Sequence, residues 1–144
     1  MPLKYQTEID QLGLSIACPK QVKSPENIEA YRFCFNPIEH DLNFLPNVVF
    51  DRVTNNPFNY IKAPDEIRCS RCGASFYTTL QSAVSKWSAL SDQIRENLGY
   101  THIANGILSN TDGVMKEPDR TGHFGFYEND TANLATKFNL IKEL

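Results

Sequence analysis

The 144-residue sequence lacks several features that would assign it directly to a functional class. It has no excess of basic residues, since 14 Lys and Arg stand against 17 Asp and Glu, for a net charge of −3. A basic surface field attracts the phosphate backbone, so nucleic acid is not favoured as a partner. No apolar run approaches the roughly 20 residues of a membrane-spanning helix, so no membrane partner is expected.

Familiar nucleotide-binding and hydrolase motifs are also missing. The sequence contains neither a P-loop nor G-x-G-x-x-G, so the usual nucleotide-binding folds are not indicated. Ser75 with His123 could supply two members of a hydrolase triad, but the G-x-S-x-G elbow is absent. The start, MPLKYQTEID, lacks the charged-then-apolar pattern of a signal peptide. We therefore expect a cytoplasmic protein.

Cysteine is scarce, with four residues in the chain. In the cytoplasm these are expected to be reduced thiols. Cys69 and Cys72, followed by Gly73, resemble one half of a zinc knuckle. A structural zinc needs four ligands and no second C-x-x-C occurs, so we expect small buried thiols and no metal. A small zinc-binding module through Cys69 and Cys72 is kept as an alternative.

The most strongly patterned stretch is residues 73–98, GASFYTTLQSAVSKWSALSDQIRENL. It predicts a short strand ending in Ser75-Phe76-Tyr77, followed by one long amphipathic helix that Thr78 caps and Gly99 ends. Apolar residues recur in it every three or four positions, which is typical of one helix face. These residues are Leu80, Ala83, Val84, Trp87, Leu90, Ile94 and Leu98. We expect this helix to be the main core helix, with Trp87 at the centre of its apolar face.

Several shorter segments predict strands. In residues 30–35 (AYRFCF), Tyr31 and Phe33 alternate with Arg32 and Cys34. We expect the aromatic side chains to face the core and Arg32 to face solvent or a cleft. Further strands are expected at residues 48–53, 102–108, 114–116, 123–127 and 139–141.

Turns and loops separate these segments. Asp112-Gly113 is a hairpin signal that would join residues 102–108 to residues 114–116. Residues 55–65 are rich in Asn and Pro and predict a long surface loop. Its aromatic residues, Phe58 and Tyr60, either close over a ligand or pin the loop to the domain, and pinning is the expected role. A short helix is expected over residues 131–138.

Together these segments predict an α+β protein. About six short strands would form a mixed or antiparallel sheet packed on the long helix, without regular βαβ alternation. Residues 1–144 are expected to form a single domain, in which residues 1–28 are poorly defined.

The candidate site residues share a position on, or just past, the polar side of an apolar strand. They are Arg32, Ser75, Tyr77, His123 and Glu128. If the strands are neighbours, these side chains could converge on one cleft. An arginine for phosphate, hydroxyls for a sugar and rings for stacking would suit a dinucleotide better than acyl transfer.

The order YRFCFNP, FLP, CGASFYTTLQSA, HIANGIL and GHFGFYEND resembles a family of small uncharacterised bacterial proteins with YR…NP…G-S-F…GHF/GHY motifs. The similarity covers roughly residues 30–135. More remotely, an Arg on the first strand, followed by a Ser-aromatic strand before a helix, resembles the ADP-ribosyltransferase superfamily and its RES-type NAD-degrading toxins. This resemblance implies NAD as the substrate.

The remote resemblance also implies roles for the candidate residues. Arg32 would hold NAD, Ser75 and Tyr77 would order the site, and Glu128 would polarise the nicotinamide ribose. We expect His123 to act in catalysis with Glu128. The protein would then be an NAD-using transferase or glycohydrolase. The alternative is a non-catalytic module in a toxin, immunity or defence setting. Under these two hypotheses, the partner of the protein is expected to be a small nucleotide ligand or another protein.

Overall fold

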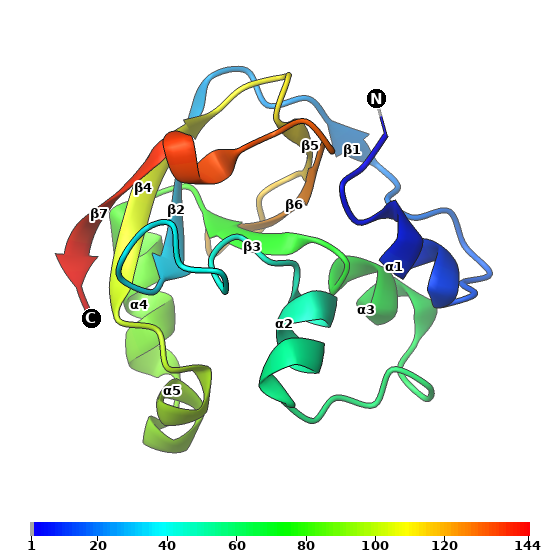
Figure 1. Cartoon of the computed structure of the whole chain (residues 1–144), viewed down its shortest axis with the longest axis horizontal. Helices are drawn as coiled ribbons and strands as arrows, with labels where there is room; N and C mark the ends of the chain where they lie inside the picture. The colour runs from blue at the N-terminus through cyan, green and yellow to red at the C-terminus, as the bar shows by residue number, and fades with distance from the viewer. Residues whose placement is uncertain (1) are drawn as a thin grey trace.

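The strands among residues 2–144, which the computed structural model describes, join one antiparallel sheet of seven strands in the order β1-β5-β6-β3-β2-β4-β7 (Figure 1). This confirms the α+β class and the strands expected at residues 30–35, 102–108, 114–116, 123–127 and 139–141. The strands are β1 (Val22–Lys23), β2 (Ile28–Cys34), β3 (Ala74–Tyr77), β4 (His102–Leu108), β5 (Gly113–Lys116), β6 (His123–Glu128) and β7 (Phe138–Glu143).

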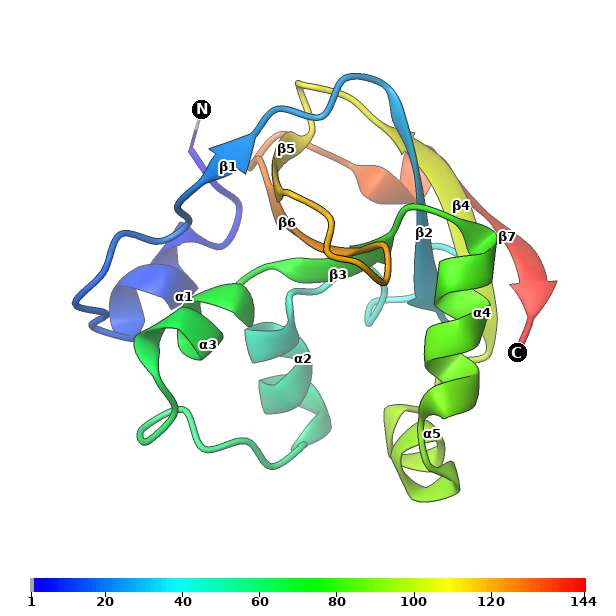
Figure 2. The ribbon, with the colours of Figure 1, turned by 180° about the vertical axis from the view of Figure 1, so that it is seen from behind.

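The helices fall into two groups that stand apart below β3 (Figures 1 and 2). One group is α1 (Gln6–Gln11), α2 (Asn47–Thr54) and α3 (Asp65–Ser70), and the other is α4 (Leu80–Ala89) with α5 (Asp92–Leu98). A single 3-10 turn, Leu134–Thr136, stands where a short helix was predicted over residues 131–138. Within residues 2–144, no helix has both the length and the apolar character needed to cross a membrane.

The prediction of one long helix is wrong, because the chain breaks between α4 and α5. Leu90 has an extended backbone, and Ser91 begins a new helix by accepting a hydrogen bond from the Ile94 N–H. Serine caps helices well because its hydroxyl competes for free backbone N–H groups. Thr79, rather than Thr78, caps α4, whereas Gly99 ends α5 in the left-handed conformation as predicted.

Two other local predictions also fail. Residues 48–53 lie in α2 rather than in a strand, with Val49 and Phe50 buried on one side of the helix. The Asp112-Gly113 turn does not form a β4–β5 hairpin, because β4 pairs with β2 along all seven residues of each strand and with β7 on its other edge. Long-range pairing of apolar strands therefore overrides a short turn signal.

The main core lies on the face of the sheet away from α4. Its centre is Phe76, which is fully buried among the rings of Phe124, Phe126 and Phe138 at centroid distances of 5.6–5.9 Å. Phe44, from the loop before α2, closes this core from the side. α4 packs on the other face, whereas α5 has no buried residue and its Ile94 is 46% exposed. The main core is thus built by strands and a loop, not by the predicted helix.

The assignment of faces in β2 is reversed from the prediction. Ala30, Arg32 and Cys34 are buried in or beside the main core, whereas Tyr31 and Phe33 are half-buried near α4. Both faces of the strand are covered by apolar groups, so alternation alone could not distinguish them. Arg32 is therefore a core residue, and only 3% of its surface is exposed.

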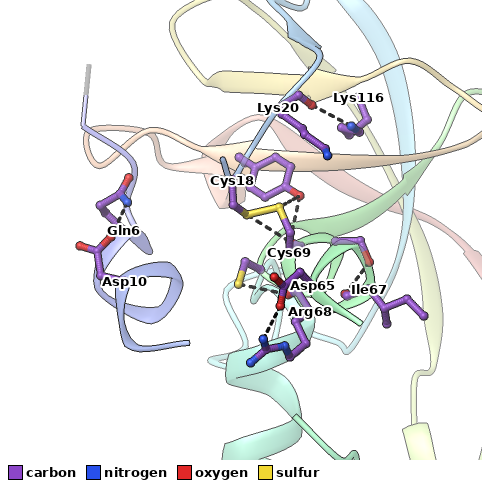
Figure 3. Close-up of a disulfide and its surroundings, with 12 residues drawn as sticks. Gln6, Asp10, Cys18, Lys20, Asp65, Ile67, Arg68, Cys69 and Lys116 are labelled. Atoms are coloured by element: carbon purple, nitrogen blue, oxygen red, sulfur yellow. Dashed lines mark hydrogen bonds and ion pairs between the residues drawn. A yellow bond between two sulfur atoms is a disulfide. The ribbon is translucent and has the colours of Figure 1, made fainter. Parts of the chain in front are cut away.

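A disulfide bond joins Cys18 to Cys69, with their Cα atoms 5.7 Å apart (Figure 3). It ties the segment between α1 and β1 to α3. Cys34 and Cys72 are free and buried, and burial raises the pKa of both thiols to about 11. The prediction of four reduced cysteines is therefore wrong for one pair. Because disulfides are rare in the cytoplasm, this bond does not favour the expected location, which stays a prediction.

The packing predicts different costs for two aromatic truncations. Phe76→Ala should lower the free energy of unfolding by about 3–5 kcal/mol, because it opens a cavity in the main core. Trp87→Ala should cost less, since Trp87 is half-buried and packs mainly on Phe33, 5.2 Å away between ring centroids. Urea denaturation measures both, with Ile94→Ala as the control expected within about 0.5 kcal/mol. Equal losses for Phe76→Ala and Trp87→Ala would contradict this description of the core.

Candidate functional site

A cleft lies between the two helix groups, with β3 as its floor. It consists of a larger cavity of about 540 Å³ and a smaller one of about 250 Å³. Five residues line both cavities and so mark where they meet: Asn47, Arg71, Ser75, Tyr77 and Lys86. The cleft therefore draws on α2, the end of α3, β3 and α4.

Three of the residues predicted from the sequence meet on the floor of this cleft. Ser75 and Tyr77 lie on one face of β3, and Tyr77 is registered with His123 on β6. The Ser75 Oγ lies 3.0 Å from the His123 Nε2, within hydrogen-bond distance. The Tyr77 ring packs edge-on against the His123 ring at 5.4 Å. The predicted convergence of Ser75, Tyr77 and His123 is thus present in the structure.

Asp119, which was not predicted, completes this group. Its Oδ2 lies 3.8 Å from the His123 Nδ1. Its Oδ1 accepts hydrogen bonds from the Thr121 hydroxyl and from the backbone N–H groups of Thr121 and His123. These bonds, led by that of the Thr121 hydroxyl, lower the pKa of Asp119, so its carboxylate is ionised at neutral pH. An Asp that begins a turn and precedes a His by four residues is the signal that could have identified it.

His123 is neutral at neutral pH. Partial burial in the cleft lowers its pKa, the nearby Lys86 ammonium lowers it further, and the Asp119 carboxylate acts in the opposite direction. A neutral imidazole has one ring nitrogen free to accept a proton. We assign the proton to Nδ1 because that nitrogen is the one near a carboxylate, at 3.8 Å, and this assignment makes Nε2 the acceptor for the Ser75 hydroxyl.

Arg32 lines the inner end of the smaller cavity from within the core. Its Nη1 donates to the Ser75 carbonyl at 2.9 Å and its Nη2 to the Leu45 carbonyl at 3.1 Å. The guanidinium also lies near the faces of Phe76 and Phe44, 5.3 and 5.9 Å from their centroids. Its Nε is buried and has no hydrogen-bond partner among residues 2–144. The arginine thus reaches the cleft from behind β3 rather than across it.

Glu128 does not join the cleft. Side chains alternate along β6, so His123 and Glu128, five positions apart, point to opposite faces. Glu128 is buried beside a separate cavity, where it forms an ion pair with Lys4. Burial raises its pKa, although Lys4 acts to lower it. The predicted grouping of Glu128 with Arg32, Ser75 and His123 is therefore not found.

Arg71 is held in one wall of the cleft by three contacts. It forms an ion pair with the buried Asp51, its Nε donates to the Tyr60 hydroxyl at 3.0 Å, and its guanidinium stacks on Phe58 at 4.1 Å. Phe58 and Tyr60 therefore pin the loop of residues 55–64 to the domain, which was the expected role. Sequence reasoning missed Arg71, because only the fold brings it near Ser75.

Aromatic and charged groups line both cavities. The rings of Phe33, Phe50 and Tyr100 line the smaller cavity, together with the charged side chains of Arg32, Asp51, Arg71 and Lys86. Lys116, Glu117 and Asp119 line the larger cavity, together with Ile67, Phe124 and Tyr127. The two cavities adjoin at Ser75 and Tyr77.

The structure gives little support to the alternative of a zinc site at Cys69 and Cys72. Cys69 is bonded to Cys18, so Cys69 and Cys72 do not form a pair of free thiols. Across residues 2–144, no group of three or more His, Cys, Asp or Glu side chains is arranged to hold a metal ion.

No protein-family model, curated protein or solved structure matches this chain. The resemblance in short motifs therefore stays a prediction. The site must be interpreted from its own geometry and charge.

The double hydrogen bond of Arg32 leads to a stability prediction. Arg32→Lys keeps the charge but not the planar fork, so one of two buried carbonyls should lose its donor. The free energy of unfolding should fall by about 1–3 kcal/mol. Chemical denaturation of both proteins measures the difference, with exposed Arg120→Lys as the matched control within about 0.5 kcal/mol. Equal stability of Arg32→Lys and wild type would contradict the bridging role.

Proposed function

We propose that the cleft binds NAD and that the protein cleaves the bond between nicotinamide and ribose, as an ADP-ribosyltransferase or an NAD glycohydrolase. The observation that carries this proposal is that aromatic rings, a hydroxyl–imidazole pair and several cations line one cleft. A dinucleotide needs all three, for its bases, its sugars and its pyrophosphate.

The charge of the cleft favours an anionic ligand. Arg32, Arg71, Lys86 and Lys116 line it, against the carboxylates of Asp51, Glu117 and Asp119. The four cations exceed the three carboxylates by one charge, and the Asp51–Arg71 pair contributes nothing to that excess. Lys86 is exposed to solvent. The Arg71 and Lys86 side chains, on opposite walls, are placed to hold a pyrophosphate between them.

The smaller cavity suits a planar base. The rings of Phe33, Phe50 and Tyr100 line it, and the Asn47 side chain supplies both hydrogen-bond donors and acceptors where the two cavities meet. Burial raises the pKa of Tyr77 to about 12, so its phenol stays neutral and can donate to a ribose oxygen. A base in the smaller cavity would place its sugar beside Ser75, where the two cavities meet and His123 lies.

The bond to nicotinamide breaks through a sugar that gains positive charge. A nearby carboxylate lowers the energy of such a transition state electrostatically. Asp119 is the ionised carboxylate closest to His123 in this cleft, 3.8 Å from Nδ1, so its negative charge acts on the site through the imidazole ring. Glu128 lies beside a separate cavity on the opposite face of β6, so its carboxylate does not reach the reacting atoms.

Titration calorimetry with NAD tests the proposal. Lys86→Ala should weaken binding about tenfold, because it removes one charge-assisted contact worth about 1.5 kcal/mol. Its stability should stay within about 0.5 kcal/mol of wild type, since Lys86 is an exposed helix residue. Lys142→Ala, on β7 and outside the residues that line the cleft, is the matched charge control and should bind NAD like wild type.

Nicotinamide release by the same proteins separates binding from catalysis. Release by wild type, with turnover lost on His123→Gln, is the expected result. If wild type binds NAD but releases no nicotinamide, the protein is a ligand-binding module and not an enzyme acting on NAD. No heat of binding and no release at millimolar NAD would remove NAD as the ligand.

A further inference from the structure

We propose that His123, positioned by Asp119, takes up the proton of an attacking hydroxyl group through the Ser75 hydroxyl, so that the second substrate is a water or alcohol that enters through the larger cavity. This inference rests on the proposed function. It adds the nucleophile, the path of its proton and a positioning role for Asp119.

The geometry sets the direction of proton transfer. Asp119 is fixed by its hydrogen bonds from Thr121 and from the His123 backbone, so its second oxygen stays near the His123 Nδ1. The opposite ring nitrogen, Nε2, then points its lone pair at Ser75 Oγ, 3.0 Å away. Because Nε2 has a single lone pair and Ser75 Oγ lies at it, an attacking hydroxyl reaches Nε2 through Ser75, by donating to Oγ as Oγ donates to Nε2.

The larger cavity supplies the approach for that hydroxyl. His123 lines it together with Thr121, Lys116 and Glu117, whereas it does not line the smaller cavity. About 38% of the His123 side chain is exposed, so the ring is accessible from this side. A nicotinamide ring in the smaller cavity and a hydroxyl in the larger one would approach the ribose from different sides.

The reaction balances without an external oxidant or reductant. The hydroxyl oxygen forms a bond to C1′ of the ribose as the C1′–nitrogen bond breaks, and nicotinamide leaves as a neutral molecule with the bonding electron pair. The Ser75 hydroxyl passes its proton to His123 Nε2 and accepts the proton of the attacking hydroxyl, and the Asp119 carboxylate stabilises the resulting imidazolium. Water as the acceptor gives ADP-ribose, and an alcohol gives its ADP-ribosyl O-glycoside.

Several charged or titratable groups face His123 and must be included in the pH dependence. They are Asp119 from the preceding turn, Lys86 from α4, Tyr77 from β3, and Lys116 with Glu117 at the end of β5. Asp119 favours the protonated ring and Lys86 disfavours it. Substitutions at these two positions should therefore shift the His123 pKa in opposite directions.

Titration of the free protein by NMR tests the pairing without NAD. The chain has three histidines, so His123→Gln identifies the His123 signal, and His40 and His102 serve as internal references. Wild-type His123 should titrate below the ordinary histidine value of about 6.5. Asp119→Asn should lower its pKa further and Lys86→Ala should raise it, whereas Asp130→Asn, an exposed control, should leave it unchanged. An unchanged pKa in Asp119→Asn would overturn the positioning role.

The pH dependence of nicotinamide release then tests the proton acceptor. The rate should rise with pH as His123 loses its proton, and Asp119→Asn should move that limb to lower pH while lowering kcat more than it changes KM. His123→Gln should lower kcat by roughly a hundredfold or more. If the pH dependence of nicotinamide release is the same in Asp119→Asn as in wild type while turnover is intact, this inference is overturned but the proposed function is not.

Two further outcomes are distinguishable. In the first, wild type releases no nicotinamide from NAD although Asp119→Asn still shifts the His123 pKa by NMR. This outcome would overturn the proposed function and the acceptor role with it. Labelling of Ser75 by a fluorophosphonate, in which Oγ displaces fluoride from phosphorus, would show that Ser75 is itself the nucleophile and overturn the role of an added hydroxyl. Unlabelled Ser75 together with a coupled pH limb supports the inference.

Discussion

The buried guanidinium group of Arg32 is the interaction on which the cleft depends. β2 and β3 share one registered pair, Tyr31 with Tyr77, and Arg32 links the strands again by donating to the Ser75 carbonyl. A cation in a protein core is costly unless its donors are used, and here two carbonyls and two aromatic faces compensate. Ser75, which faces His123 through its hydroxyl, is thereby fixed from the core side through its backbone.

The walls of the cleft depend on contacts made outside it. Asp51 and the loop aromatics Phe58 and Tyr60 hold Arg71 in place, so a surface loop sets the position of a cation that we assign to phosphate binding. On the other side, the break between α4 and α5 ends α4 shortly after Lys86. The two walls thus belong to separately anchored groups of helices, both covering the face of the sheet opposite the main core.

Two carboxylates illustrate what could and could not be predicted about the site. Glu128 follows His123 by five positions on one strand, and alternation alone would have placed them on opposite faces. Asp119 precedes the strand in a turn, where no alternation applies, and its contact with His123 follows from the turn's own hydrogen bonds. The sequence alone could have excluded Glu128 from the site, whereas the contact of Asp119 with His123 could be found only from the geometry of the turn.

Local pattern by itself determined the α+β class, most of the strands, the Gly99 helix end and the shared face of Ser75 and Tyr77 on β3. These depend on side-chain periodicity and glycine conformation, which are properties of neighbouring residues. Only the tertiary structure decided which face of β2 is buried, that Cys18 meets Cys69, and that Arg71 and Lys86 face one cleft. Each of these joins segments distant in the chain, and both faces of β2 are apolar enough to be covered. The choice between them was made by what packs on each side: Phe44 and the phenylalanines of the main core against one face, and α4 against the other.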